Sequence, residues 1–339
     1  MNIDTGLDIV LIWVDGNDPE WQDEYKKHSG KYINGDTSEI RFRDFELLKY
    51  WFRGIEKYVP WVRKIHFVTC GHYPNWLDIN NHKINFVKHS DFIPKEYLPT
   101  FNSHTIELNL HRIKGLSENF IYFNDDFFII NNINSDYFFN LKTKLPKDCL
   151  VFNPIISGGI SHIVMNNLEI IKKYHTKNSI INKHWKKILN LKYGKDLLRT
   201  LFLMPWPELI GFKDTHLPVA FKKETYIELW NLEYDALHTT CKSKFREDNN
   251  ISQYLIRYWQ LANGCFEAAD VTRKSKYLDL GRDNINQICN LIESQNKSIL
   301  IINDANVENF ENVKIKLVKS FNEILPEKSN FENDVDTNA

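Results

Sequence analysis

Two adjacent aspartates, Asp125 and Asp126, follow Asn124 directly after the apolar run 119–123. Carboxylates at the end of a strand can hold a hard divalent cation such as Mg²⁺, which typically takes one or two carboxylates together with phosphate oxygens of a substrate. A turn in which aspartates accept hydrogen bonds from backbone N–H groups fits the same pattern. Neighbouring carboxylates repel each other in a half-buried site, so a cation or hydrogen bonds must offset that repulsion. Asp125 and Asp126 are therefore predicted metal ligands, with a structural turn as the alternative.

A second polar cluster contains Asp15 and Gly16 and ends the first apolar run of the chain. Gly16 would let the backbone approach a ligand closely, which suits the edge of a nucleotide; an ordinary Asx–Gly turn is the alternative. Arg41 and Arg43 precede a predicted helix. Arginines at a helix N-terminus oppose its dipole unless an anion is bound there, and their guanidinium groups match a diphosphate. A solvated arginine–aspartate pair is equally open for this segment.

Further polar groups gather at the start of a helix that is predicted to open at Ser103. Serine or asparagine before an apolar periodic run is a helix-start signal. Glu107 and His111 are four residues apart, which places them on one face of this helix. The pair suits metal ligation or, more commonly, a structural hydrogen bond. His216 and Arg246 lie much farther along the chain, and the sequence alone does not join them in space.

The elements that must position these residues alternate along the N-terminal half. Apolar runs bounded by turn residues predict buried strands at 8–14, 64–69, 83–87 and 119–123. Helical spacing lies between them, at 44–55 and 103–116. Strands that alternate with helices predict an α/β fold with a mostly parallel central sheet and helices on both faces, as in Rossmann-like folds. Ligands collect at the carboxyl ends of such strands, where the polar clusters lie.

From about residue 150 the pattern becomes more helical, with one further strand predicted at 297–302 and an amphipathic helix at 307–325. Helical patterns at 165–201 and through 261 lie between. We therefore expect a ligand-binding α/β half at 1–150, a helical insertion with the remainder of the catalytic domain at 151–326, and a tail at 327–339.

Composition excludes several classes of protein. The 339 residues carry 43 Lys and Arg against 44 Asp and Glu, and this balance disfavours a non-specific nucleic-acid binder. No apolar run approaches the roughly 20 residues of a membrane span, and the start has no signal-like apolar core. Five scattered cysteines predict a reducing cytoplasm rather than a disulfide framework. The absence of Walker-type and GxGxxG loops argues against P-loop ATPases and standard dehydrogenases.

At these residues the chain resembles the Stealth family of sugar-1-phosphate transferases, which includes bacterial capsular polysaccharide phosphotransferases and the catalytic chain of animal GlcNAc-1-phosphotransferase. Four blocks carry the resemblance and span most of the chain. The first is DIVLIWVDGNDP at 8–19, and the long second block runs from RFRD at 41–44 through LPTFNS at 98–103 to FIYFNDD at 120–126. The third comprises HLP at 216–218, FR at 245–246, ISQYL at 251–255 and YW at 258–259, and the fourth includes IND at 302–304 and SNFE at 329–332.

The resemblance implies a GT-A-like fold that binds a nucleotide sugar, expected to be a UDP-N-acetylhexosamine. A hexosamine 1-phosphate would pass to a glycan hydroxyl, with release of UMP, during capsule or surface polysaccharide synthesis. Mg²⁺ or Mn²⁺ would be held by Asp125 and Asp126, with Asp126 the first choice. His216 would accept the proton of the attacking hydroxyl, and Arg246 would bind the migrating phosphoryl group.

The resemblance also implies a pocket for the nucleotide sugar, and its implied contacts are Asp15, Gly16, Asn102 and Ser103, with Arg41 or Arg112 as second phosphate contacts. Two departures from the family pattern bear on the site. His72 stands where relatives often have glutamine. In relatives an acidic residue usually follows the arginine that corresponds to Arg246 by a few positions. In this chain either Asp248 or Asn250 could correspond to it.

Two other functions remain open. A conventional glycosyltransferase would break the sugar C1–O bond, form a glycoside and release UDP, using the same strand-end carboxylates. A non-catalytic carbohydrate-binding protein would use the abundant aromatic residues as stacking platforms, but it gives no reason for paired acids and arginines at strand ends. The expected location is cytoplasmic. Peripheral contact with the inner face of the membrane, through Lys-rich helices at 172–195, is a further expectation, with a solvated face as its alternative.

Overall fold

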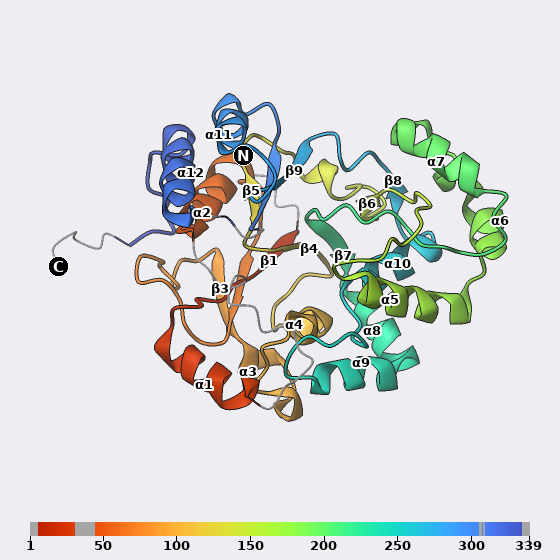
Figure 1. Ribbon diagram of the computed structural model, residues 1–339, viewed down its shortest axis with the longest axis horizontal. Coiled ribbons are helices and arrows are strands. Elements are labelled where there is room, and N and C mark those ends of the chain that lie inside the picture. Colours follow the sequence, from red (N-terminus) through yellow and green to blue (C-terminus); the bar gives the residue numbers. More distant parts are fainter. Residues whose placement is uncertain (1–5, 31–44, 305–306, 308, 334–339) are drawn as a thin grey trace.

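A five-stranded sheet forms the centre of the protein (Figure 1). The computed structural model describes residues 6–30, 45–304, 307 and 309–333. The strand order is β3-β2-β1-β4-β7, with β1 at Asp8–Ile12, β2 at Ile65–Thr69, β3 at Ile84–Lys88, β4 at Asn119–Phe123 and β7 at Val219–Lys222. The first four strands are parallel, whereas β7 runs antiparallel to β4. The predicted α/β fold with a mostly parallel sheet is confirmed.

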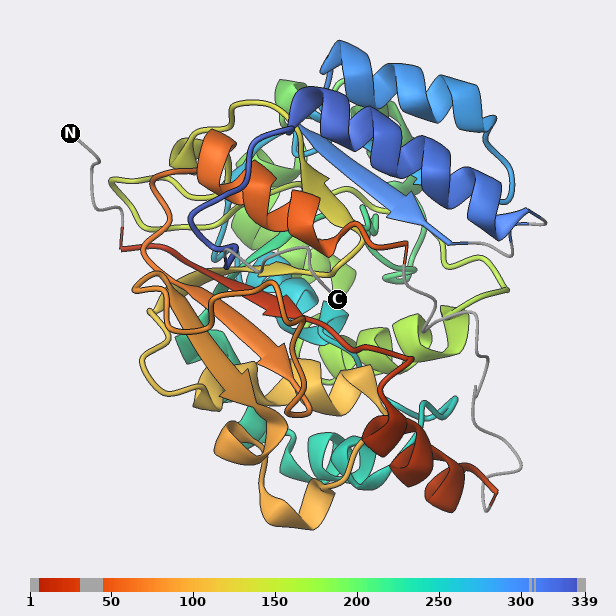
Figure 2. The same ribbon diagram turned by 90° about the vertical axis from the view of Figure 1, so that its left-hand side faces the viewer.

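Both faces of this sheet are buried, because each central strand sends apolar side chains to either side. In β1, Ile9 and Leu11 join one core cluster and Val10 joins the other. The helix α2, at Leu48–Tyr58, packs in the first cluster with α11 at Ile285–Ser294 and α12 at Phe310–Ile324. Figure 2 shows α2 between the sheet and the α11–α12 pair.

The second core cluster lies under a larger group of helices, and these contribute many of its apolar side chains. They are α4 at Ser103–Asn109, α5 at Ser161–Tyr174, α6 at Lys177–Ile188, α8 at Lys223–Leu232, α9 at Tyr234–Lys242 and α10 at Tyr254–Ala262. Three further helices lie nearer the surface: α1 at Pro19–Ser29, α3 at His89–Phe92 and α7 at Lys195–Leu203.

A smaller sheet extends from the end of β4. The strand β5, at Phe127–Ile129, follows β4 after a short turn and pairs antiparallel with β10 at Ile299–Asn303. Next to β10 lies β9 at Ser275–Asp279, in parallel, and two short strands pair elsewhere, β6 at Lys147–Asp148 and β8 at Glu267–Ala268. Both of the larger sheets therefore combine strands from before and after residue 150.

The sequence missed some boundaries and some elements. The predicted strand 8–14 ends at Ile12, and the helix predicted at 103–116 ends at Asn109, followed by a 3₁₀ turn at Leu110–Arg112. The helical stretch 165–201 is divided among α5, α6, a 3₁₀ turn at Leu191–Tyr193 and α7. Two other 3₁₀ turns occur at Lys95–Tyr97 and Ser135–Tyr137. The strands β5, β7 and β9 were not predicted, because short strands at the sheet edges give weak periodic signals.

Among the helices in the described ranges, none has both the length and the apolar character required to cross a lipid bilayer.

Candidate active site

The turn between β4 and β5 presents two carboxylates beside an ordered asparagine. The carbonyl of Asn124 accepts a hydrogen bond from the Phe127 amide at 3.2 Å, and Asn124 Oδ1 lies 2.5 Å from the Tyr122 hydroxyl. Asp125 is exposed, and the side chain of Asp126 is 24% exposed. The segment is therefore a tight turn, and it leaves the Asp125 side chain exposed and the Asp126 carboxylate partly exposed.

His216 approaches this turn from the loop that precedes β7. Its Nε2 lies 3.6 Å from Asp126 Oδ2, and its ring meets the rings of Phe127 and Tyr277 edge-on, at centroid distances of 5.3 and 5.5 Å. The backbone φ of His216 is +44°, a left-handed conformation that costs free energy in a residue with a side chain. The fold thus holds an imidazole and a carboxylate together at some conformational cost.

Buried charges from α10 hold the loop that carries His216. The guanidinium of Arg257 donates to both carboxylate oxygens of Asp148, at 2.7 and 2.8 Å, and to the carbonyl of Lys213 at 2.9 Å. The Tyr258 hydroxyl lies 2.7 Å from Asp214 Oδ2. Burial, with the nearby charge of Asp148, raises the pKa of Asp214 although Arg257 and Tyr258 act in the opposite direction. The loop is therefore held at Lys213 and Asp214, just before His216.

No local sequence pattern singles out this set of charges. Arg257 and Tyr258 lie on a helix with the apolar pattern of a core element, and their partners are more than 40 residues away. The YW pair at 258–259 was the only available signal, through its place in the third block of the resemblance.

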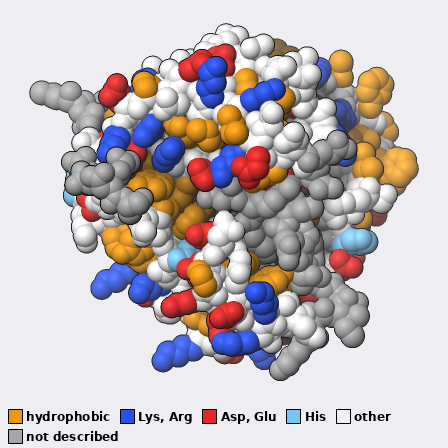
Figure 3. Space-filling model, turned by 60° about the vertical axis from the view of Figure 1, so that its left-hand side comes forward, with side chains coloured by type: hydrophobic (Ala, Val, Ile, Leu, Met, Phe, Trp, Pro, Cys, Tyr) orange, Lys and Arg blue, Asp and Glu red, His pale blue; other side chains and the backbone are white. Residues whose placement is uncertain are grey.

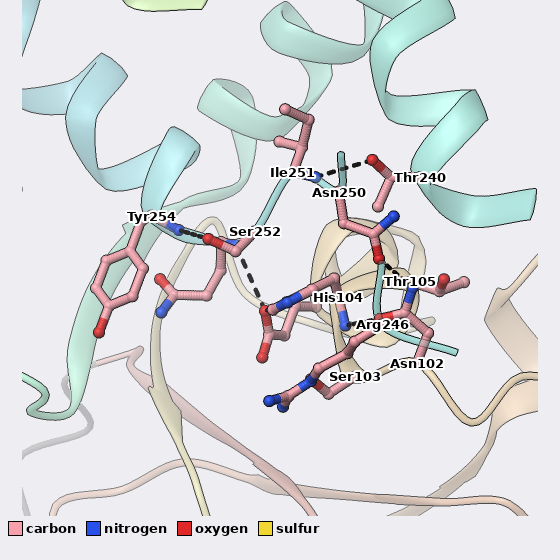
Figure 4. Close-up of polar contacts among 12 residues, drawn as sticks. Asn102, Ser103, His104, Thr105, Thr240, Arg246, Asn250, Ile251, Ser252 and Tyr254 are labelled. Atoms are coloured by element: carbon pink, nitrogen blue, oxygen red, sulfur yellow. Dashed lines mark hydrogen bonds and ion pairs between the residues drawn. The ribbon is translucent and has the colours of Figure 1, made fainter. Parts of the chain in front are cut away.

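Arg246 and Ser103 meet although 143 residues separate them. Ser103 is the first residue of α4, and its Oγ accepts from Arg246 Nη2 at 2.6 Å and Nε at 3.1 Å. Figure 4 shows the two side chains next to each other, with the guanidinium extending beyond the helix start. Both side chains are partly exposed. The structure thus places a cation at the start of a helix, where anions are favoured.

Two buried asparagines support this contact. Asn102 caps α4 through Oδ1, which accepts from the His104 amide at 3.1 Å, and its Nδ2 donates to Asn250 Oδ1 at 2.8 Å. Asn250 Oδ1 also accepts from the Glu247 amide at 3.0 Å. Asn250 is fully buried and holds the loop through these bonds, whereas Asp248 is exposed to solvent.

A buried carboxylate links the arginine to the aspartate turn. Glu107 Oε2 lies 3.2 Å from His104 Nδ1, and Glu107 Oε1 lies 3.2 Å from the Tyr122 hydroxyl that also contacts Asn124. Burial alone would raise the pKa of Glu107, but the hydrogen bond and charge of His104, with the charge of Arg246, outweigh it and keep the pKa low. The Glu107 carboxylate and the Arg246 guanidinium therefore attract each other electrostatically.

The predicted pairing of Glu107 with His111 is wrong. The α-helix ends at Asn109, so the i, i+4 relation does not hold, and Glu107 pairs with His104 instead. His111 stacks on Tyr226, and burial lowers its pKa to about 3.

Asp15 and Gly16 form an Asx turn at the carboxyl end of β1. Asp15 Oδ1 accepts from the Asn17 amide at 2.8 Å, and the Gly16 carbonyl accepts from Gln22 Nε2 at 2.9 Å. The Asp15 amide donates to His72 Nε2 at 2.8 Å, so the residue that departs from the family pattern orders this turn. Because β1 is parallel to β4, this turn and the aspartate turn lie at the same edge of the sheet.

Two expected contacts of the pocket need correction. Asn102 is fully buried with its amide engaged on both sides, so it positions Ser103 rather than lining a pocket. Arg112 stacks over Trp230. Its neighbour His111 lies near Lys223. Lys223 directly follows Lys222, the β7 residue that pairs with Asn119 at the start of β4. Arg112 therefore lies at the opposite edge of the sheet from the aspartates. Arg41 lies outside the described residues.

Within the described ranges, no three His, Cys, Asp or Glu side chains converge as a metal cage. Asp125 and Asp126 supply only oxygen donors, and Asp126 Oδ2 faces His216. That donor set fits Mg²⁺, which is commonly held by one or two protein carboxylates with water and phosphate oxygens completing its shell.

Comparison with known proteins identifies the family. The family profile described as Stealth protein CR2, conserved region 2, matches residues 41–147. The chain is 42% identical over 331 residues to the capsular polysaccharide phosphotransferase WcwK of Streptococcus pneumoniae, covering 96% of this chain and 98% of that protein. The chain belongs to the Stealth family. The predicted resemblance is confirmed.

Two other similar proteins have related names. The exopolysaccharide phosphotransferase cps2G of Lactiplantibacillus plantarum is 36% identical, with 96% of each chain covered. The receptor polysaccharide phosphotransferase WefC of Streptococcus gordonii is 36% identical, covering 96% of this chain and 98% of that protein. The matched Stealth region contains Ser103 and the aspartate turn, while His216 and Arg246 come from later in the chain.

Proposed function

We propose that this Stealth protein transfers a hexosamine 1-phosphate from a UDP-sugar, a UDP-N-acetylhexosamine, to a hydroxyl of an acceptor glycan during capsule or surface polysaccharide synthesis. The observation that carries the proposal is the placement of His216 beside Asp126, 3.6 Å apart, at the edge of a parallel sheet. The names of the Stealth relatives, all polysaccharide phosphotransferases, support the same reaction class.

The proposed step exchanges one P–O bond for another. The acceptor oxygen attacks the β-phosphorus of the donor, and the bond between that phosphorus and the bridging oxygen of the diphosphate breaks. UMP leaves with the bridging oxygen, and the product is a phosphodiester. The sugar C1–O bond is not broken, so the anomeric configuration is retained.

His216 would accept the proton of the attacking hydroxyl. Imidazole is suited to this role near neutral pH, and its partly exposed position leaves room for an acceptor. The imidazolium formed in the step would be stabilised by the Asp126 carboxylate. The left-handed backbone at His216, together with the fixed Asp214, would keep the ring in place before the acceptor arrives.

Arg246 would bind the non-bridging oxygens of the migrating phosphoryl group. Phosphoryl transfer spreads negative charge over these oxygens, so catalysis is mostly positioning and electrostatic stabilisation. Ser103 engages Nε and Nη2, which leaves the remaining guanidinium donors for a ligand.

Asp125 and Asp126 would hold Mg²⁺ or Mn²⁺, which when bound neutralises charge on the donor diphosphate. Asp15 and Gly16 would contact the nucleotide from the end of β1, and Ser103 would contact it from the start of α4. The reaction would take place in the cytoplasm, with a polysaccharide acceptor and no nucleic-acid partner.

A panel of UDP-sugars, assayed with and without EDTA and with a polysaccharide acceptor, tests the proposal. We expect release of UMP from one UDP-N-acetylhexosamine, loss of that release in EDTA, recovery on added Mg²⁺, and a phosphodiester signal in the ³¹P NMR spectrum of the product. A glycoside together with UDP would indicate the rival glycosyltransferase reaction and contradict the proposal. Undiminished UMP release in EDTA would remove the metal role alone.

A further inference from the structure

The segment 161–206 has a charge balance unlike that of the rest of the chain. It contains nine lysines and arginines but only two acidic residues, whereas the whole chain has a net charge of -1. On the face shown in Figure 3, by contrast, Lys and Arg side chains are interspersed with Asp and Glu. Positive charge is therefore concentrated in α5, α6 and α7.

The outward side of α7 is apolar, which is the reverse of an ordinary surface helix. Leu198, Leu201 and Phe202 are spaced i, i+3, i+4, and they are 58%, 46% and 84% exposed. Leu191 before the helix is 87% exposed, and Trp206 after it is 57% exposed. Thr200, on the opposite side of the helix, is fully buried. We call the five exposed apolar residues the α7 face.

This face is held in place by the fold. The buried ammonium of Lys177, from α6, donates to the carbonyls of Leu203 and Met204, both at 2.7 Å, and also bonds the carbonyl of Trp206. Thr200 Oγ1 accepts from the Phe152 amide at 3.3 Å. A cation that binds the last carbonyls of a helix stabilises its C-terminal end. The exposed apolar side chains are therefore presented by an anchored helix.

Exposed cations lie on α7 itself and on the preceding helix α6. Lys195 and Arg199 are exposed and lie at helical spacing from Leu198 and Phe202. Lys183 and Lys186 of α6 are also exposed. Lys183, Lys186 and Lys195 make no ion pair within the part of the chain that the structure describes. In Figure 1, α6 and α7 lie together at the edge of the molecule, away from β1, β2 and β3.

We propose that the α7 face binds the surface of an anionic lipid bilayer. Exposed leucine and phenylalanine flanked by lysine are the features of interfacial helices, whose apolar side enters the boundary between headgroups and acyl chains. The neighbouring lysines supply charge complementary to anionic headgroups. A polyanionic glycan would satisfy the lysines but gives no reason for the exposed aliphatic side chains, so the observations favour lipid. None of these residues belongs to the candidate active site, so the inference stands apart from the proposed function.

Flotation of the full-length protein with vesicles tests this inference. We compare phosphatidylcholine vesicles with vesicles that contain phosphatidylglycerol as the anionic lipid. The wild type is expected to bind the anionic vesicles at least roughly tenfold more strongly than the neutral ones, and less strongly at high salt. The triple variant Leu198→Ser, Leu201→Ser, Phe202→Ser and the triple variant Lys183→Glu, Lys186→Glu, Lys195→Glu are each expected to lose roughly tenfold or more in binding.

A matched control lies on α12, which offers an exposed apolar residue and an exposed lysine four positions apart, Ile315 and Lys319. The variant Ile315→Ser, Lys319→Glu should bind vesicles like the wild type. Circular dichroism and thermal unfolding check that every variant is folded. The inference is overturned if the wild type binds neither vesicle, or if folded α7 variants bind as well as the wild type. It is also overturned if the face binds dextran sulfate but no vesicle, or if the triple serine variant dissociates a dimer of the chain without changing vesicle binding.

Discussion

At the scale of single residues, the proposed chemistry depends on two side chains at one edge of the sheet, Asp126 and His216. We predict that Asp126→Asn and His216→Asn each lower turnover by roughly 10² or more, because each removes a charge or a proton acceptor at the reacting centre. Asparagine is chosen at position 216 because it tolerates the left-handed backbone found there. Turnover is measured as UMP released per enzyme at saturating donor.

Asp248→Asn is the matched control for these variants. Asp248 is an exposed aspartate two residues beyond Arg246, and its side chain makes no hydrogen bond or ion pair that involves other described residues. It should therefore leave turnover within about a factor of two, in line with ordinary surface substitutions. Near wild-type turnover in both site variants would remove the roles assigned to Asp126 and His216.

What the sequence could predict at this scale was residue type, and what it could not predict was proximity. The aspartates were visible because they follow an apolar run directly. The contact between Ser103 and Arg246 bridges 143 residues, and no local pattern records it. From its position before α4, Asn102 is expected to contact a ligand in the pocket. In the structure its side chain is buried and hydrogen-bonded to Asn250, which comes from a distant loop.

At the scale of elements, the buried central strands could be predicted from the sequence, whereas the short strands at the sheet edges could not. The runs that became β1, β2, β3 and β4 are continuous and apolar because both faces of the sheet are covered. The strand β5 has only three residues, and its partner β10 lies about 170 residues later, so its existence depends on tertiary pairing. The periodicity of apolar residues therefore indicates whether a strand is buried, but it does not identify the strand with which it pairs.

One close packing contact leads to a prediction on stability. Gly54 lies inside α2, and a Cβ there would sit 2.3 Å from the carbonyl oxygen of Ile129 in β5. Alanine normally gains about 1 kcal/mol over glycine inside a helix, but an overpacked core costs about 1–3 kcal/mol. Because the obstacle is backbone, we predict that Gly54→Ala lowers the free energy of unfolding by about 1–2 kcal/mol, measured by urea denaturation.

The control for this variant is Gly30→Ala, since Gly30 has a φ of -62° and a Cβ at this position would meet no other atom within 4 Å. It should change the free energy of unfolding by no more than about 0.5 kcal/mol. An unchanged or increased stability of Gly54→Ala would mean that α2 and β5 separate easily.

The start of β1 gives a prediction on pH. Asp8 is fully buried; burial alone would raise its pKa, but hydrogen bonds and charge from His66, the Ser117 amide and Arg63 hold the pKa below its ordinary 3.8. A depressed carboxyl pKa contributes stability above the unfolded pKa, and this contribution is lost as the pH falls through the folded value. Asp8→Asn should therefore be less stable than the wild type by about 2 kcal/mol at pH 7.

The difference in the free energy of unfolding between the wild type and Asp8→Asn should become smaller as the pH falls below about 4. Urea denaturation at pH 7, 5 and 3.5 measures it, and the exposed Asp136, replaced by asparagine, serves as the control. A gap that stays constant down to pH 3.5 would show that the Asp8 carboxylate is not stabilised by its partners in the folded protein.

At the scale of the whole molecule, the fold class was predictable but the way its halves interlock was not. An α/β pattern followed by helices suggested parts that divide near residue 150. In the structure β7 extends the sheet beside β4, and β10 pairs with β5, so strands from after residue 150 complete both sheets. The local sequence around an edge strand does not indicate that this strand pairs with one from the other half of the chain.

Arg257 connects the two halves, and its removal tests whether they fold together. The guanidinium is 1% exposed and forms a bidentate pair with Asp148, from the other side of residue 150, while Nη1 lies 3.5 Å from Asp214. Removing one partner of a buried ion pair leaves an uncompensated charge and typically costs about 3–5 kcal/mol. We predict that Arg257→Met lowers the free energy of unfolding by that amount while unfolding stays a single transition, followed by tryptophan fluorescence and by circular dichroism.

Arg282→Met is the comparison for this variant, because Arg282 is 87% exposed and its pair with Asp279, at 3.6 Å, is a surface contact. Such a pair is worth at most about 1 kcal/mol, so its loss should be small. If the two probes reported separate transitions in the wild type, the halves would be independent domains. A single transition that shifts only in Arg257→Met would mean that the loop carrying His216 is stabilised by the same charge that joins the halves, since Arg257 also binds the Lys213 carbonyl. The geometry of the site and the cooperativity of the fold would then depend on one residue.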